Sequence, residues 1–149
     1  MVLTRVENLV PTLRHQTLPE NAMVIVIIHW RIKPTRDAEA AFFDYWAETA
    51  KIDDKSNLAG EFLSQPMPAK EFPYRVDDLS FGVGILDCWH YMNVGFWKDK
   101  ESFHEQVGKH MKDDKPIQHF EADRRTRTIL EPKQWRVGAY GLPKAGTCE

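Results

Sequence analysis

Several features that define a class of protein are scarce or missing in this sequence. Only two of its 149 residues are cysteines, Cys88 and Cys148, so no disulfide framework is predicted and we expect free thiols in a reducing cytoplasm. The longest apolar run, residues 23–28, is far too short to span a bilayer, and charges interrupt the N-terminal segment where a signal peptide would need an apolar core. The formal net charge of -2 gives no basic excess to attract nucleic acid or an anionic membrane. We therefore predict a cytoplasmic protein with neither of these partners.

The motifs of common nucleotide-binding, hydrolytic and zinc enzymes are also missing. Gly82 and Gly84 lack the third glycine of a dinucleotide-binding loop. No Gly-x-Ser-x-Gly, Cys-x-x-Cys or His-Glu-x-x-His sequence occurs, and no two histidines have the four-residue spacing of a helical metal site. The basic cluster of Arg124, Arg125 and Arg127 is interpreted as a solvated strand edge, because the chain as a whole is slightly acidic.

The composition that is present is typical of one globular domain. Hydrophobic residues make up 42% of the chain and charged residues 28%, which argues against disorder. Aromatic residues reach 11%, which suits a tight core, an oligomer interface or a pocket for a flat ligand. We divide the chain into an N-terminal arm (1–22), a domain (23–140) and a C-terminal tail (141–149).

The hydrophobic pattern predicts the order strand, helix, strand, strand, helix, strand. Strands are expected at 23–33, 57–65, 87–97 and 125–130, with a short closing strand at 135–140. The first strand is apolar without alternation, which predicts that both of its faces are buried. Helices are expected to begin at the N-caps Thr35 and Asp99 and to end near residue 53 and before Pro116. The order is that of an α+β, ferredoxin-like βαββαβ fold, and the long segment 66–86 is either a lid or an insertion that covers a partner.

Two junctions of strand and helix resemble the antibiotic-biosynthesis-monooxygenase superfamily of dimeric α/β barrels. In the first, a β-branched strand ends in Trp30-Arg-Ile-Lys-Pro34 and passes directly into an amphipathic helix. In the second, a strand ends in Asn93-Val-Gly-Phe-Trp-Lys-Asp99 and leads into a helix that carries Phe103. The resemblance covers about residues 23–131. It implies a four-stranded antiparallel sheet with two helices on one face, a twin sheet packed on the other face in a homodimeric barrel, and a pocket between sheet and helices.

The resemblance further implies a monooxygenase-like enzyme that oxidises a small hydrophobic, aromatic or polyketide-like substrate without a bound cofactor. Such a substrate supplies its own reactivity, because its deprotonation gives an electron-rich phenolate or carbanion that reacts with oxygen. The alternatives are a non-catalytic dimeric barrel that binds haem or another hydrophobic ligand, and a structural dimer with a filled barrel. Where the haem-degrading branch has a strand Asn, a helical Trp and a helical His, this chain has Trp30, Gln106 and Pro116. That departure argues against such a haem enzyme, and His119 is the residue expected to ligate haem if haem binds.

Two histidines are candidates for the catalytic base. His110 lies on the predicted apolar stripe of the second helix, which faces the pocket in the resembled family, and its alternative role is a hydrogen bond to a backbone carbonyl. His29 ends the first strand and is otherwise a structural, hydrogen-bonded histidine. Tyr91 and Asn93 share a strand face and either bind the substrate or complete an interior network. The remaining substrate-binding candidates are aromatic side chains that would serve equally as core: Trp30, Phe42, Trp46 and Trp97.

Overall fold

The computed structural model describes residues 23–77, 87–136 and 138–141. The predicted arm (1–22), residues 78–86 of the long segment and residues 142–149 of the tail lie outside the described residues. The elements in chain order are β1 (Val24–Ile32), α1 (Arg36–Asp44), a π-helical turn (Tyr45–Thr49), β2 (Leu58–Ser64), a 3-10 turn (Ala69–Glu71), β3 (Trp89–Trp97), α2 (Lys100–Gln106), a second 3-10 turn (Gly108–His110) and β4 (Glu121–Leu130).

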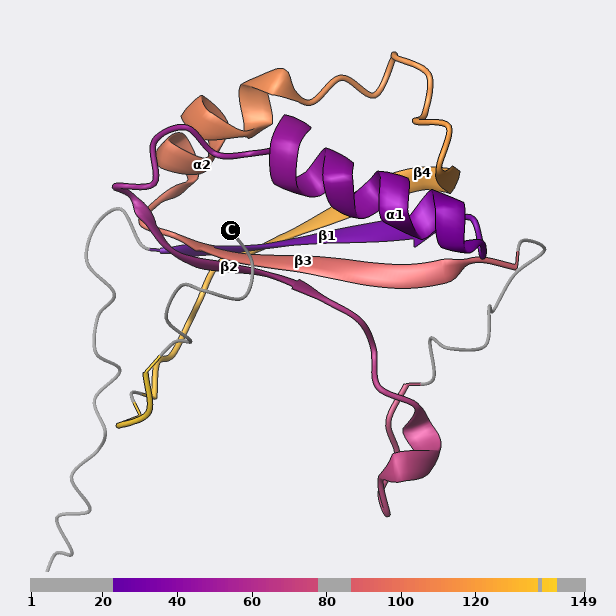
Figure 1. The fold of residues 1–149 in the computed structure, drawn as a ribbon. Coiled ribbons are helices and arrows are strands. Elements are labelled where there is room, and N and C mark those ends of the chain that lie inside the picture. The colour runs from indigo at the N-terminus through magenta and orange to yellow at the C-terminus, as the bar shows by residue number, and fades with distance from the viewer. Residues whose placement is uncertain (1–22, 78–86, 137, 142–149) are drawn as a thin grey trace, which may run out of the picture.

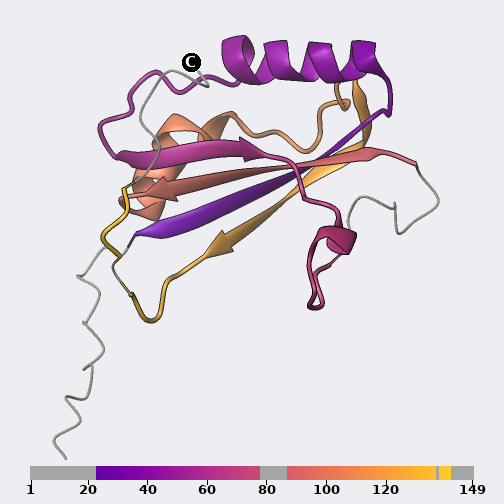
Figure 2. The ribbon, with the colours of Figure 1, turned by 60° about the horizontal axis from the view of Figure 1, so that its bottom comes forward.

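The four strands form one antiparallel sheet in the order β2-β3-β1-β4. Both α1 and α2 lie on the same side of this sheet (Figure 1), and the strands fan out across it with a pronounced twist (Figure 2). This arrangement confirms the predicted α+β class and is compatible with a ferredoxin-like fold.

The first helix begins where the sequence predicts and changes its winding before it ends. The Thr35 hydroxyl oxygen accepts a hydrogen bond from the backbone N–H of Ala38 at 3.2 Å, which caps α1. After Asp44 the chain widens into the π-helical turn, in which the N–H of Ala50 donates to the carbonyl of Tyr45 at 2.9 Å. Because of this turn, the consecutive residues Tyr45 and Trp46 are both half-buried and both pack against the core.

The second helix and the fourth strand differ from the prediction. α2 is capped by Asp99, whose carboxylate accepts from the N–H of Ser102 at 2.7 Å, but it ends at Gln106. The 3-10 turn follows immediately, so the predicted helical stripe through His110 was wrong. β4 begins at Glu121, before the predicted start, because two register shifts interrupt the alternation on which the prediction relied. The described residues between 135 and 140 form no strand, and Trp135 and Tyr140 are exposed.

The two faces of the sheet differ in how far they are covered. The side chains of β1 alternate strictly: those from Val24 to Ile32 at even positions are buried under the helices, and Ile25, Ile27, His29 and Arg31 are half-buried on the other face. In the single chain, therefore, only one of the two faces of β1 that were predicted to be buried is fully covered. We call this second surface the open face. Its members also include Phe62 of β2 and His90, Met92, Val94 and Phe96 of β3, and residues 66–77 leave the sheet on the same side (Figure 1).

Candidate functional site

A cavity of about 500 Å³ lies between the sheet and the helices, where the family resemblance predicts a pocket. Its floor includes Ile28 and Trp30 of β1, Asn93 of β3 and Glu61 of β2. The π-helical turn and the segment that follows α2 complete the wall, with Trp46 and His110 among their contributions. Residues of all four strands, of the π-helical turn and of the end of α2 thus border one cavity.

The strand register explains which side chains share the cavity floor. Asn93 pairs with Leu63 on one side and with Ile28 on the other, and Ile28 pairs with Arg127 of β4. Side chains that face each other in an antiparallel sheet point to the same face. Since neighbouring strands lie about 4.8 Å apart, the backbones of β2 and β4 at the two ends of this row are separated by about 14 Å. The cavity therefore has one end formed by β2 and another formed by β4.

The β2 end carries a hydrogen-bonded relay of three side chains. The indole Nε1–H of Trp46 donates to Asn93 Oδ1 at 2.8 Å, and Asn93 Nδ2–H donates to Glu61 Oε1 at 2.6 Å. Because an indole can only donate, its bond fixes which atom of the Asn93 amide faces Glu61. Burial raises the pKa of the Glu61 carboxyl above its ordinary value, and the bond from Asn93 and the charge of Lys55 oppose that rise. The carboxyl group of the half-buried Glu61 therefore lies at the β2 end of the cavity with a raised pKa.

Gly95 makes room for this carboxyl group. It is directly opposite Glu61 in the β2–β3 ladder. A Cβ atom on Gly95 would lie 3.1 Å from Nε1 of Trp97 and 3.7 Å from Oε1 of Glu61. Any larger residue would press on the Trp97 ring, so the missing side chain helps to define the β2 end of the cavity.

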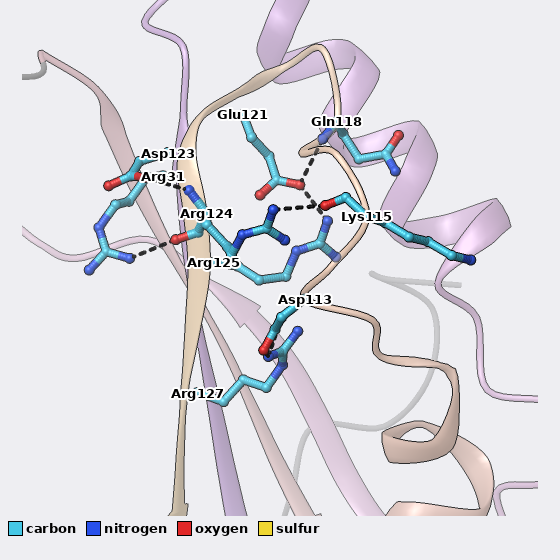
Figure 3. Close-up of polar contacts among 9 residues, drawn as sticks. All are labelled: Arg31, Asp113, Lys115, Gln118, Glu121, Asp123, Arg124, Arg125 and Arg127. Atoms are coloured by element: carbon cyan, nitrogen blue, oxygen red, sulfur yellow. Dashed lines mark hydrogen bonds and ion pairs between the residues drawn. The ribbon is translucent and has the colours of Figure 1, made fainter.

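The β4 end of the cavity is basic, because a bulge in β4 brings two consecutive arginines to it. His29 pairs with Thr126 and Arg31 pairs with Asp123, so Arg124 and Arg125 together oppose the single residue Trp30. The extra residue lets both guanidinium groups reach the 113–121 segment, and Arg31 points away from it (Figure 3). Arg124 donates to the carbonyl of Lys115 at 2.7 Å.

Arg125 and Arg127 are held inside this end of the cavity wall. Arg125 forms an ion pair with the fully buried Glu121, and its guanidinium carbon lies 4.0 Å from the centroid of the Trp30 ring. Arg127 donates from one nitrogen to both carboxylate oxygens of Asp113, at 2.9 and 3.1 Å. The side chains of Arg125 and Arg127 are only 19% and 20% exposed, so the interpretation of the basic cluster as a solvated strand edge was wrong.

The structure places four of the sequence-predicted site residues on the cavity and the others elsewhere. Trp30, Trp46, Asn93 and His110 line it, and His110 is exposed at its rim on the 3-10 turn. Phe42, Tyr91 and Trp97 belong to the core beside it: Phe42 packs on Trp30 with ring centroids 4.8 Å apart, and Trp97 packs on Phe103 at 5.9 Å. The Tyr91 hydroxyl donates to Glu39, and burial together with this bond raises the pKa of Tyr91 well above its usual range. His119, the residue predicted for haem, is exposed and does not line the cavity.

His29 lies on the open face, on the opposite side of the sheet from the cavity. The Arg31 guanidinium, which can only donate, lies 3.3 Å from His29 Nδ1, so His29 Nε2–H donates to His90 Nδ1 at 2.8 Å. His90 Nε2 then faces the Cys88 sulfur at 3.6 Å. This chain of donors requires both imidazoles to be neutral. Burial, then the charge of Arg31, then His90 lower the pKa of His29 to about 4, and burial and Arg31 lower the pKa of His90.

Sequence reasoning missed Glu61 and the role of the arginines. The signal for Glu61 is a single acidic residue at the same strand parity as Leu63, on the face of β2 that the helices cover. The signal for the arginines is weaker, because consecutive residues such as Arg124 and Arg125 share a face only at a bulge.

No protein-family model matches this chain, and no curated protein matches its sequence. Within residues 23–77, 87–136 and 138–141, no three His, Cys, Asp or Glu side chains are grouped to hold a metal ion. None of the described helices is long and apolar enough to cross a membrane.

Proposed function

We propose that this protein is a small oxygenase-like enzyme that binds an aromatic or polyketide-like substrate in the cavity and oxidises it without a bound cofactor. The observation that carries the proposal is the carboxyl group of the half-buried Glu61, which Asn93 and Trp46 hold at one end of a cavity whose lining includes Tyr45 and Trp46. A base in that position removes a proton from a substrate that packs against Trp46. In this proposal Glu61 is the catalytic base, the role for which the sequence suggested His110 or His29.

The chemistry needs only the substrate, oxygen and a base. Glu61 accepts a proton from an activated methylene group, and the resulting carbanion is the enolate or phenolate form of the substrate. The carbanion gives electrons to molecular oxygen and forms a C–O bond, and the protonated peroxide then loses water, so that one methylene group and one dioxygen molecule become one carbonyl group and one water. The raised pKa of Glu61 improves the match between the base and a weakly acidic substrate. Trp30, Trp46 and Tyr45 exclude water from the reacting carbon.

We further propose that the functional unit is a homodimer joined through the open face. That face presents half-buried Ile25, Ile27, Val94 and Phe96, an apolar surface that a second sheet would cover. The cavity lies on the other side of the sheet, so such a dimer leaves each substrate site accessible.

Anthrone is a suitable first substrate, because its single methylene group is oxidised to the carbonyl of anthraquinone. The measurement is oxygen consumption together with the absorbance of the product, for the wild type, Glu61→Gln and the matched control Glu101→Gln. Glu101 is an exposed residue of α2 outside the cavity. We expect Glu61→Gln to lower kcat by at least about 100-fold, the usual contribution of a general base, and Glu101→Gln to leave it unchanged.

The pH profile and a second variant separate the candidate bases. Because only the deprotonated carboxyl accepts a proton, kcat/KM should rise with pH through a pKa above the ordinary range of Glu, and Glu61→Gln should abolish that limb. A large loss in His110→Ala with full activity in Glu61→Gln would transfer the role of base to His110. Anthrone binding without oxygen consumption, or a Soret shift with equimolar haem, would favour the non-catalytic ligand-binding barrel instead.

A further inference from the structure

The cavity lining is more basic than the chain to which it belongs. Six lysine and arginine side chains line it against four carboxylates, although the whole chain has a formal net charge of -2. The three arginines all come from β4, and the bulge directs two of them into the wall. One of the four carboxyl groups is Glu61, whose raised pKa weakens its negative charge further. The field inside the cavity therefore attracts an anion.

Arg124 and Arg127 do not use all of their hydrogen-bond donors within the protein. Arg127 uses a single nitrogen, Nη1, for both bonds to Asp113, and its buried Nε–H has no hydrogen-bond partner. The Asp113 side chain is 62% exposed, so a surface residue provides the pair's only carboxylate. Arg124 makes no ion pair with any described carboxylate. A buried guanidinium edge without an acceptor is costly unless a ligand satisfies it.

Other buried polar atoms in the same wall also lack a partner. The indole Nε1–H of Trp30 is one of them, and Trp30 is 2% exposed. Glu121 Oε2 is another, although Oε1 of the same carboxylate accepts a hydrogen bond from Arg125. The wall therefore contains two buried donors without a partner, one from Arg127 and one from Trp30, and one buried acceptor without a partner, whose charge Arg125 offsets.

We infer that the ligand of this cavity is an aromatic carboxylic acid whose carboxylate binds the free edge of Arg127. The Nε and Nη2 of Arg127 form the fork that holds a carboxylate with two parallel hydrogen bonds. The aromatic part then lies along Trp46, and the opposite end of the molecule reaches Glu61 across the row of strands. This inference rests on the proposed function, because it names the substrate class for the same cavity. It also assigns a specificity role to Arg127, which takes no part in the proton transfer.

A pair of isosteric probes tests the inference directly. 2-Naphthoate carries a carboxylate, and 2-naphthamide has the same ring and shape without the charge. Isothermal titration calorimetry of the full chain with each probe gives the ratio of their affinities. We expect the acid to bind at least about 10-fold more tightly than the amide, and the ratio to fall as salt concentration rises.

Two variants should move the affinity in opposite directions. Arg127→Gln should weaken naphthoate binding about 10-fold and leave naphthamide binding unchanged. Asp113→Asn removes the competing carboxylate of the protein and should strengthen naphthoate binding severalfold, which a merely misfolded variant cannot do. The matched control is Arg136→Gln, an exposed arginine outside the cavity lining, which should change neither affinity.

The outcomes separate this inference from the proposed function. Equal affinities for acid and amide in the wild type, or an unchanged ratio in Arg127→Gln, would overturn the inference and leave the aromatic site intact. If neither probe binds, the inference fails, and the anthrone assay then decides the proposed function separately. Oxidation of anthrone without any preference for the acid would support the proposed function alone.

Discussion

At the scale of single residues, Asn93 organises the β2 end of the cavity. Its carbonyl oxygen accepts from Trp46 and its amide group donates to Glu61, and the side chain is 2% exposed, so its orientation is fully determined. A buried amide that satisfies both neighbours holds them at fixed separations. Through Asn93, the π-helical turn and β2 are coupled, and the position of Glu61 depends on where α1 ends.

The histidine pair on the open face makes stability depend on pH in the acidic range. The pKa of His29 falls from 6.5 in the unfolded chain to about 4 in the fold, and the pKa of His90 is also lowered. A lowered pKa means that this contribution to stability is fully present above pH 6.5 and is lost as pH falls through about 4, because the unfolded chain binds the proton first.

We expect His29→Gln to reduce that dependence. A glutamine can still accept from Arg31 and donate to His90, but it takes up no proton. Urea unfolding of both proteins at pH 7, 5.5 and 4.5 should show a smaller loss of unfolding free energy in His29→Gln. His104→Gln is the matched control, because His104 is exposed on α2 and should keep the wild-type dependence. A variant that loses stability as steeply as the wild type would show that the pair has no such role.

The sequence correctly predicted the face of a strand on which a side chain lies, because side chains alternate between the two faces. Tyr91 and Asn93 were expected on one face of a strand, and both are buried on the face under the helices. Parity could not reveal which of them reaches the cavity, since that depends on neighbours distant in sequence: Glu39 takes the Tyr91 hydroxyl and Trp46 reaches Asn93. His29 and His110 lie on opposite sides of the sheet. The spacing of residues in the sequence could not predict this separation.

At the scale of elements, the predicted strands and N-caps were confirmed where local chemistry decides them. β1, β2 and β3 fall within one or two residues of the prediction, and Thr35 and Asp99 cap their helices. The errors lie where tertiary contacts override periodicity. α1 passes into a π-helical turn after Asp44, and α2 stops before Gly108 although an apolar pattern continues beyond it. β4 extends back to Glu121 because its bulges place buried charges in the strand.

The N-cap of α1 tests whether helix stability and cavity geometry are separable. Removing the hydroxyl in Thr35→Ala leaves the N–H of Ala38 without its acceptor, which should cost about 1 kcal/mol. Such a loss lowers the melting temperature by roughly 3 °C for a domain of this size. Thr35→Ser keeps the cap and should retain stability. Because Thr35 lies outside the cavity lining, both variants should bind naphthoate like the wild type; a large loss of affinity in Thr35→Ala would show that the helix start positions the site.

At the scale of the whole molecule, the two faces of the sheet differ in their chemistry, and we propose a different role for each. The covered face holds the cavity, with the Glu61 carboxyl group at β2 and a cationic end at β4. The open face holds apolar side chains around the neutral histidine pair. The proposed ligand site and the proposed assembly surface lie on opposite sides of one sheet and can be altered independently, since no described side chain belongs to both.

The assembly surface can therefore be tested without disturbing the cavity. Val94 is half-buried at the centre of the open face, opposite Ile27 on one side and Phe62 on the other. We expect the wild type to sediment as a dimer at micromolar concentration and Val94→Lys to sediment as a monomer, because a desolvated lysine inside an apolar interface has no partner charge. Ala40→Lys, on the exposed surface of α1, adds the same charge elsewhere and should remain dimeric. Far-ultraviolet circular dichroism should show the same secondary structure in all three proteins. A monomeric wild type would refute the dimer, and a dimeric Val94→Lys would place the interface on another surface.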